Sequence, residues 1–136
     1  MKKINNIKNL NFIFLKYNTM LRKGLNSVNK KSLFDASLLI EKKIKKNSKI
    51  FVAGNGGSAA VSNHFICDFL KNVKYYTKLN PKVISLSSNL ETITAISNDF
   101  SYDQVFKYQA ESLFEKNDLL IIISSSGNSR NIREVL

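Results

Sequence analysis

Two polar loops in the sequence contain residue types that bind phosphate. The first follows the apolar run 50–53 and is Gly54-Asn55-Gly56-Gly57-Ser58-Ala59, called here the glycine loop. The second follows the almost unbroken apolar run 118–123 and is Ser124-Ser125-Ser126-Gly127-Asn128-Ser129, called the serine loop. A helical pattern begins after each loop, so free backbone N–H groups and hydroxyls can donate to one anion. A single phosphate fits this arrangement. The alternative is a serine-rich turn that only caps its helix. The presence of the glycine loop after another strand favours the phosphate site over this alternative.

The glycine loop lacks the partners that two common nucleotide sites require. It satisfies the loose dinucleotide pattern G-x-G-x-x-G/A, but no Asp or Glu lies between Asp68 and Glu91 to bind a ribose. No G-x-x-x-x-G-K-[ST] sequence occurs for a nucleoside triphosphate, and no G-x-S-x-G sequence for a serine hydrolase. The pattern therefore disfavours a nicotinamide dinucleotide and excludes a P-loop.

His64 and Asp68 follow the glycine loop at a spacing of i, i+4, which places both side chains on one helix face. That spacing suits two metal ligands, or a base with its partner. A His–Asp hydrogen bond at the helix edge is the simpler alternative, and spacing alone favours it. At 100° per residue Asp68 points within about 20° of Val61, on a predicted apolar stripe, where a carboxylate is costly unless compensated. The nearby Cys67 is expected to be a small buried thiol.

The elements that carry these residues alternate between strand and helix. Strands are predicted at 49–53, 82–86 and 118–123, the last buried on both faces, and helices at 58–72, at 90–96 with 101–114, and from 128. This alternation predicts an α/β fold, a doubly wound parallel sheet flanked by helices in three layers, of flavodoxin-like type. The helix at Leu136 has no C-cap signal, which predicts that the C-terminal part of the domain is missing.

The N-terminal third is predicted to be helical. Apolar residues recur at helical spacing from Ile4 to Leu21, and Gly24 is a candidate end of that helix. A second helix is predicted from Ser32, with Asp35 in a capping-box position, to about Lys46.

Composition limits the class of protein. The net charge is +11, from 21 basic and 10 acidic residues, but arginine occurs only at positions 22, 130 and 133. Proteins that recognise nucleic-acid bases in a sequence-specific way depend on arginine, so nucleic-acid binding is disfavoured as the main function. No apolar run is long enough to cross a bilayer, no signal peptide is evident and a single cysteine cannot form an internal disulfide. We therefore predict a cytoplasmic protein without a membrane partner.

Three motifs together resemble the sugar isomerase (SIS) domain superfamily, and within it the phosphoheptose isomerases. They are GNGGSAA at 54–60 with His64, SNDF at 97–100 with Tyr102 and Phe106, and ISSSGNS at 123–129. The resemblance implies that residues 1–47 form an N-terminal helical segment for oligomerisation, as in a homotetramer. Residues 48–136 would be a partial SIS domain, with both segments part of one domain.

The resemblance also implies a reaction and a set of site residues. The reaction is aldose–ketose isomerisation of sedoheptulose 7-phosphate to a manno-heptose 7-phosphate, a precursor of bacterial surface polysaccharides such as lipopolysaccharide. His64 and Asp68 would bind zinc, and Asp68, where the family generally has glutamate, would also transfer the proton. The family's remaining glutamine and histidine ligands lie beyond Leu136. The implied substrate-binding residues are Asn55, Gly56, Ser58, Asp99, Ser124, Ser125, Ser126 and Ser129.

Two other functions remain open for this sequence. One is a non-catalytic module that binds a sugar phosphate and regulates through protein contacts. The other is an inactive fragment with a vestigial site. The shortened carboxylate at Asp68, with about 1.5 Å less reach than glutamate, is compatible with both.

Overall fold

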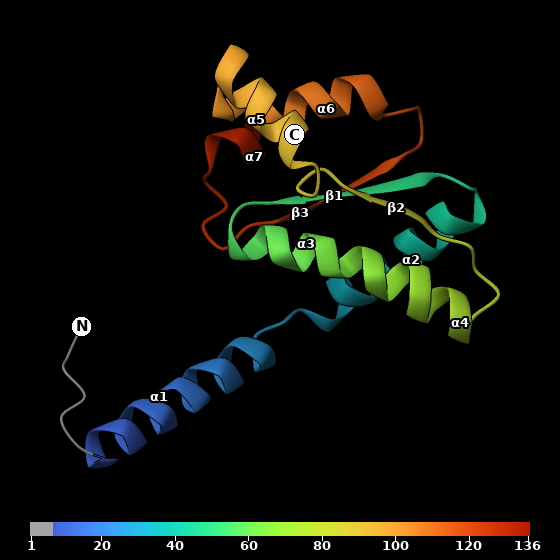
Figure 1. Cartoon of the computed structure of the whole chain (residues 1–136). Coiled ribbons are helices and arrows are strands. Elements are labelled where there is room, and N and C mark those ends of the chain that lie inside the picture. The colour runs from blue at the N-terminus through green and yellow to red at the C-terminus, as the bar shows by residue number, and fades with distance from the viewer. Residues whose placement is uncertain (1–6) are drawn as a thin grey trace. The chain divides into compact units, whose positions relative to one another are not determined.

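The computed structural model describes residues 7–136 and divides the chain into two compact units, residues 1–37 and 38–136. The division falls inside the second helix, before the predicted boundary at residue 47. Figure 1 shows the elements of both units, each of which is described by itself. No helix within residues 7–136 is both long enough and apolar enough to span a membrane.

The first unit contains α1 (Ile7–Asn26) and the start of α2 (Lys30–Lys45). The predicted residue Ile4 lies outside the described residues, and α1 continues past Gly24. The predicted start of α2 at Ser32 is wrong, because Asn29 caps the helix and its Oδ1 accepts from the Ser32 N–H at 3.0 Å. Asp35 instead pairs with Lys31 at 3.1 Å.

Three strands form the predicted parallel sheet. They are β1 (Lys49–Gly54), β2 (Lys82–Ser85) and β3 (Leu119–Ile123), in the order β2-β1-β3. The central strand β1 is fully buried from Ile50 onward, but every residue of β3 is only half-buried. The expectation that β3 is buried on both faces is therefore wrong. The physical reason is strand order, since β3 pairs on only one side within the described chain.

Helices cover both faces of this sheet, as the alternation of elements predicts (Figure 1). One face carries α3 (Gly57–Cys67), which continues through a π-helical turn (Asp68–Val73) into α4 (Lys74–Tyr76). The other face carries α5 (Leu90–Asp99), a 3-10 turn (Tyr102–Gln104), α6 (Val105–Leu113) and α7 (Arg130–Glu134). The predicted three-layer α/β architecture is confirmed.

Alternate residues of β1 supply the two apolar cores. Phe51 and Ala53 pack with Leu86, Phe106 and residues of α5 to α7. Ile50 and Val52 pack on the opposite face with Val83, Ile44 and side chains of α3. Successive side chains of a strand point to opposite faces, so one apolar run of β1 serves both layers.

The starts of β1 and β3 are joined by Asp118. Its carboxylate accepts from the Lys49 N–H at 2.8 Å and from the Glu115 N–H at 3.0 Å. Lys49 Nζ donates to Glu115 at 2.7 Å, and this bond raises the pKa of Lys49 above its ordinary value of 10.5. Because the pKa of folded Lys49 is raised, the contribution of its charge to stability is still fully present as the pH rises to 10.5 and is lost as the pH passes through the raised pKa.

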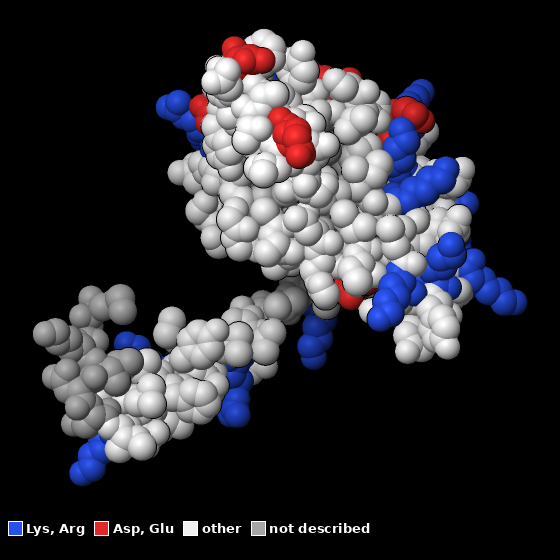
Figure 2. All heavy atoms as spheres, in the orientation of Figure 1, with Lys and Arg blue, Asp and Glu red and all other residues white. Residues whose placement is uncertain are grey.

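The charged side chains of the second unit are unevenly distributed. In Figure 2 the basic side chains of this unit lie mainly on the side where Figure 1 places α4, and acidic ones lie mainly near α5 and α6. The glycine loop lies at the other end of the α3 to α4 passage (Figure 1). On the face shown in Figure 2, the basic side chains therefore do not gather around that loop.

Candidate functional site

The glycine loop and the serine loop lie at the same edge of the sheet. β1 and β3 are adjacent and parallel. Gly54, the first residue of the glycine loop, is in register with Ile123, which immediately precedes the serine loop. The side-chain amides of Asn55 and Asn131 then bond to each other at 2.8 and 2.9 Å. The predicted meeting of the two loops is confirmed, and it occurs where ligands bind in open parallel sheets.

The glycine loop brings α3 very close to the end of β1. A Cβ built on Gly54 would lie 2.7 Å from the carbonyl oxygen of Ser58, so only glycine fits there without a shift of the backbone. Gly56 has a φ of 53°, a conformation that glycine adopts without strain. No side chain caps α3, but the Ser58 and Ala59 N–H groups of its first turn already donate to the carbonyls of Asn55 and Gly56 at 2.9 and 3.0 Å. Backbone donors that the loop can offer to a ligand therefore come from the residues before Ser58.

The serine loop is held in shape by its own hydroxyls. The Gly127 N–H donates to Ser124 Oγ at 3.0 Å, and the Asn128 N–H donates to Ser126 Oγ at 3.2 Å. Each hydroxyl uses an acceptor position in these bonds and keeps its O–H for donation to a ligand. Ser129 is the N-cap residue before α7, and its side chain makes no capping bond. Ser125 is exposed. The loop is thus both ordered and able to donate.

Replacing Gly127 with alanine is expected to destabilise the serine loop. Its φ of 62° is unfavourable for a residue with a Cβ, although no atom lies within 4 Å of the position that a Cβ would take. We expect the free energy of unfolding to fall by about 1 kcal/mol, measured by urea denaturation. Asparagine, which tolerates this conformation, should cost less than alanine. Equal costs for the two variants would contradict this explanation.

His64 in α3 and Asp68, the first residue of the π-helical turn that continues α3, lie on one exposed face of this helical passage, as predicted. Their side chains are 72% and 50% exposed, and His64 Nε2 lies 3.6 Å from Asp68 Oδ1. This distance is too long for a hydrogen bond, which disfavours the simpler alternative. Two zinc ligands at about 2.1 Å and tetrahedral angles lie about 3.4 Å apart. The pair therefore fits two positions of a metal site, but no cluster of three or more His, Cys, Asp or Glu exists within residues 7–136.

Two predictions about the surroundings of Asp68 are wrong. Val61 is 53% exposed, and Ser62 is the residue of α3 that is buried against the sheet. A small side chain is needed there because α3 approaches β1 closely at Gly54 and Ser58. The face of α3 that packs on the sheet is therefore turned away from Asp68, and the Asp68 side chain is half exposed. Cys67 is exposed rather than buried.

The SNDF motif reaches the glycine loop through Tyr102. Asp99 ends α5, is exposed and accepts a hydrogen bond from Asn98 at 2.9 Å. The Tyr102 hydroxyl donates to Asn55 Oδ1 at 2.9 Å. The structure thus connects this motif to the site, and the bond is made by Tyr102 rather than by Asp99.

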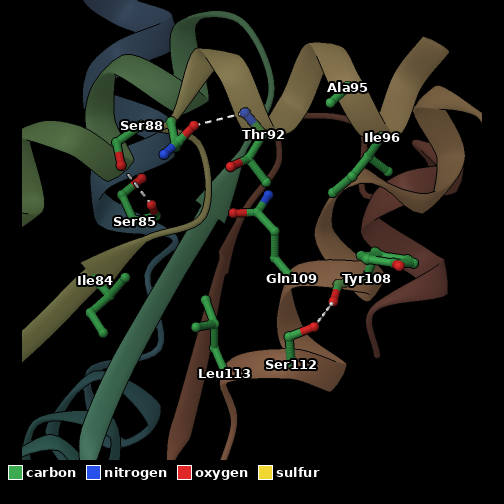
Figure 3. A pocket seen from close by; sticks show the side chains of 11 residues that line it. Ile84, Ser85, Ser88, Thr92, Ala95, Ile96, Tyr108, Gln109, Ser112 and Leu113 are labelled. Carbon is green, nitrogen blue, oxygen red and sulfur yellow. Dashed lines mark hydrogen bonds between the residues drawn. The ribbon is translucent and has the colours of Figure 1, made fainter. Parts of the chain in front are cut away.

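A pocket of about 590 Å³ lies between β2, α5 and α6 and is shown in Figure 3. Gln109 lies inside it, and its amide donates to the carbonyls of Leu86 and Val105 at 3.0 and 2.7 Å. None of the predicted site residues lines this pocket. The candidate phosphate site is therefore separate from it.

The sequence matches the SIS domain model over residues 14–136. The chain belongs to the SIS domain family. This SIS domain is 40% identical to the phosphoheptose isomerase of Helicobacter pylori strain Shi470 over 119 residues. The aligned residues cover 88% of this chain and 61% of that protein. The domain is 38% identical over 123 residues to the phosphoheptose isomerase of Aliarcobacter butzleri, covering 90% of this chain and 64% of that protein.

Solved structures resemble this SIS domain as well. A phosphoheptose isomerase from Neisseria gonorrhoeae superposes with a TM-score of 0.80 at 27% identity, covering 96% of this chain and 67% of that chain. One from Francisella tularensis gives 0.82 at 25% identity, covering 97% and 67%. The SIS domain described here thus spans about two thirds of the length of these proteins.

Two residues of the SIS domain site were not found from the sequence. Ser87 Oγ accepts from the Gly54 N–H at 3.1 Å and donates to the Gly54 carbonyl at 2.8 Å, which ties the end of β1 to the loop after β2. Asn131 bonds to Asn55, 76 positions away. Neither has a local sequence signal, because each partner is brought near only by the pairing of strands.

Proposed function

We propose that the protein binds a phosphorylated sugar at the edge where the glycine and serine loops meet, and catalyses aldose–ketose isomerisation. The proposed reaction converts sedoheptulose 7-phosphate to a manno-heptose 7-phosphate, for surface-polysaccharide precursor synthesis. The observation that carries the proposal is the juxtaposition of these loops through the Asn55–Asn131 pair. The names of the similar proteins, phosphoheptose isomerases, support the substrate class.

The serine loop would hold the phosphate and so position the reacting end of the sugar. Hydroxyls of Ser124, Ser125, Ser126 and Ser129 would supply hydrogen bonds to the phosphate oxygens. Binding energy from this remote group helps to orient the carbons that react. We assign Asn55, Gly56, Ser58 and Asp99 to the sugar portion.

Asp68 would move the proton. Isomerisation removes a proton from one carbon, passes through an enediol and returns a proton to the adjacent carbon. The Asp68 carboxylate can accept that proton and give it back, while hydrogen-bond donors stabilise the developing oxyanion. His64 and Asp68 would hold zinc, which when bound would supply Lewis acidity at that oxygen. The 3.6 Å separation of their side chains supports this assignment.

The exposed apolar side chains of α1 support oligomerisation as part of the proposal. Phe14, Leu21 and Leu25 are each at least half exposed, and at 100° per residue they lie within about 40° of one another on one face of α1. Contiguous exposed apolar surface of this kind marks contact sites between proteins. We propose that the N-terminal segment pairs copies of the chain, in a homotetramer as the family resemblance implies.

A non-catalytic sugar-phosphate-binding module is the second candidate. The exposure of His64 and Asp68 favours it, because in the described chain this pair is not enclosed with the two loops. It shares the phosphate site with the first candidate and differs in lacking proton transfer.

Incubation with sedoheptulose 7-phosphate separates the candidates. The isomerase proposal predicts that the aldose 7-phosphate forms. Its formation is measured by chromatography of the sugar phosphates. The binding-module alternative predicts no aldose but a rise in melting temperature on addition of the sugar phosphate. Absence of both effects would reject both candidates and support an inactive fragment.

A further inference from the structure

Three segments of the candidate site meet at the side chain of Asn55. Its Nδ2 donates to Asn131 Oδ1 at 2.8 Å, and Asn131 Nδ2 donates back to Asn55 Oδ1 at 2.9 Å. The Tyr102 hydroxyl donates to the same Asn55 oxygen at 2.9 Å. These bonds join the glycine loop, the 3-10 turn and α7.

The hydrogen-bonding capacity of the Asn55 side chain is nearly used up by these contacts. An amide oxygen has two lone pairs, and Asn55 Oδ1 accepts two hydrogen bonds, from Asn131 and Tyr102. One of the two N–H groups of Nδ2 is given to Asn131. A sugar can therefore receive at most one hydrogen bond from this side chain and can donate none to it. The Asn55 side chain is therefore poorly suited to recognise sugar hydroxyls.

The side chain of Asn131 is buried at its contact with Asn55. It is 2% exposed, and a buried amide must be hydrogen-bonded because leaving it unpaired is costly. Its side-chain bonds, one donated and one accepted, are to Asn55. The neighbouring Arg130–Asp103 ion pair joins the same turn and α7 at 3.6 Å, but it is largely exposed and so contributes little.

The amide pair fixes the position of the glycine loop relative to the serine loop. At Gly56 and Gly57 no atom lies within 4 Å of the position that a Cβ would take, so packing does not hold that part of the glycine loop. Asn131 lies two residues after Ser129, the end of the serine loop. A bond from Asn55 to Asn131 therefore sets the spacing of the donors on one loop relative to those on the other.

We propose that Asn131 and Tyr102 are positioning residues that hold Asn55 and thereby set the separation of the glycine and serine loops. The Asn55 side chain fastens the two loops together, and the sugar phosphate is bound by the backbone and hydroxyl donors that this fastening aligns. The inference rests on the proposed function and replaces the assignment of the Asn55 side chain as a sugar ligand.

A double-mutant cycle tests the proposal. Affinity for sedoheptulose 7-phosphate is measured by calorimetry, well below the melting temperatures, for the unchanged protein, Asn55→Ala, Asn131→Ala and the double variant. Each single change is expected to weaken binding about 10-fold, and the double variant no further, because both remove one shared interaction. Tyr102→Phe should weaken binding about 3-fold, since it removes one of the three bonds. Asn63→Ala, at an exposed asparagine on α3, is the control and should bind normally.

A second ligand separates positioning from a general loss of stability. Inorganic phosphate can be held by the serine loop alone, so its affinity should change less than about 3-fold in Asn131→Ala. Equal losses for phosphate and sugar phosphate, losses that multiply in the double variant, or normal sugar-phosphate binding by Asn131→Ala would each overturn the proposal.

Failure of the unchanged protein to bind sedoheptulose 7-phosphate would reject the proposed function. In that case, amide hydrogen exchange still tests whether Asn131 positions the glycine loop. The Ser58 N–H donates to the Asn55 carbonyl at 2.9 Å, and the Ala59 N–H donates to the Gly56 carbonyl at 3.0 Å. Asn131→Ala should increase the exchange of both amides at least about 10-fold, and Asn63→Ala should not. Unchanged exchange in Asn131→Ala would overturn the positioning role independently of any ligand.

Discussion

Turnover of sedoheptulose 7-phosphate is expected to fall at least about 100-fold when Asp68 is replaced by asparagine. An amide has nearly the size of the carboxylate but cannot accept the proton that isomerisation moves. Asp68 lies ten residues beyond Ser58 on one continuous helical passage, about 15 Å at 1.5 Å per residue. Binding of inorganic phosphate should therefore stay within about 2-fold of the unchanged protein. The measurements are aldose 7-phosphate formation and phosphate titration.

Two further variants make the Asp68 experiment specific. Glu111→Gln neutralises an exposed carboxylate on α6 and should leave turnover unchanged. Asp68→Glu restores the carboxylate with about 1.5 Å more reach and the residue type typical of the family, so it should retain far more turnover than Asp68→Asn. Unchanged turnover in Asp68→Asn would refute the role of Asp68 in proton transfer.

Gly54→Ala is expected to lower the free energy of unfolding by about 3 kcal/mol, with a fall in melting temperature of about 10 °C. The added Cβ would lie 2.7 Å from the Ser58 carbonyl oxygen and 2.8 Å from the Ser58 carbonyl carbon. Both are backbone atoms, so α3 as a whole must move away from β1. The measurements are urea denaturation and thermal unfolding followed by circular dichroism.

Gly57→Ala provides the matched control for the Gly54 experiment. A Cβ on Gly57 meets no heavy atom within 4 Å, and Gly57 begins α3 without a positive φ. We expect its free energy of unfolding to stay within about 0.5 kcal/mol of the unchanged protein. Similar losses for the two variants would show that flexibility of the loop, rather than space at Gly54, requires glycine.

The sequence by itself determined the architecture and the location of the candidate site. Apolar runs predicted all three strands, two of them followed by the glycine and serine loops, and the alternation of strands with helices predicted a parallel sheet. Parallel strands end at the same edge, so the loops after them had to lie together. The i, i+4 spacing of His64 and Asp68 likewise placed both side chains on one face of α3.

Only the tertiary structure decided which residues contact one another across the site and which are buried. Asn131 pairs with Asn55 because β1 and β3 are neighbours, and no local pattern encodes a partner 76 positions away. Ser62 rather than Val61 faces the sheet because the close approach at Gly54 admits only a small side chain. β3 is half-buried because of its place in the strand order, although its composition is that of a central strand. Local spacing specifies the face of an element, whereas burial and hydrogen-bond partners depend on which elements become neighbours.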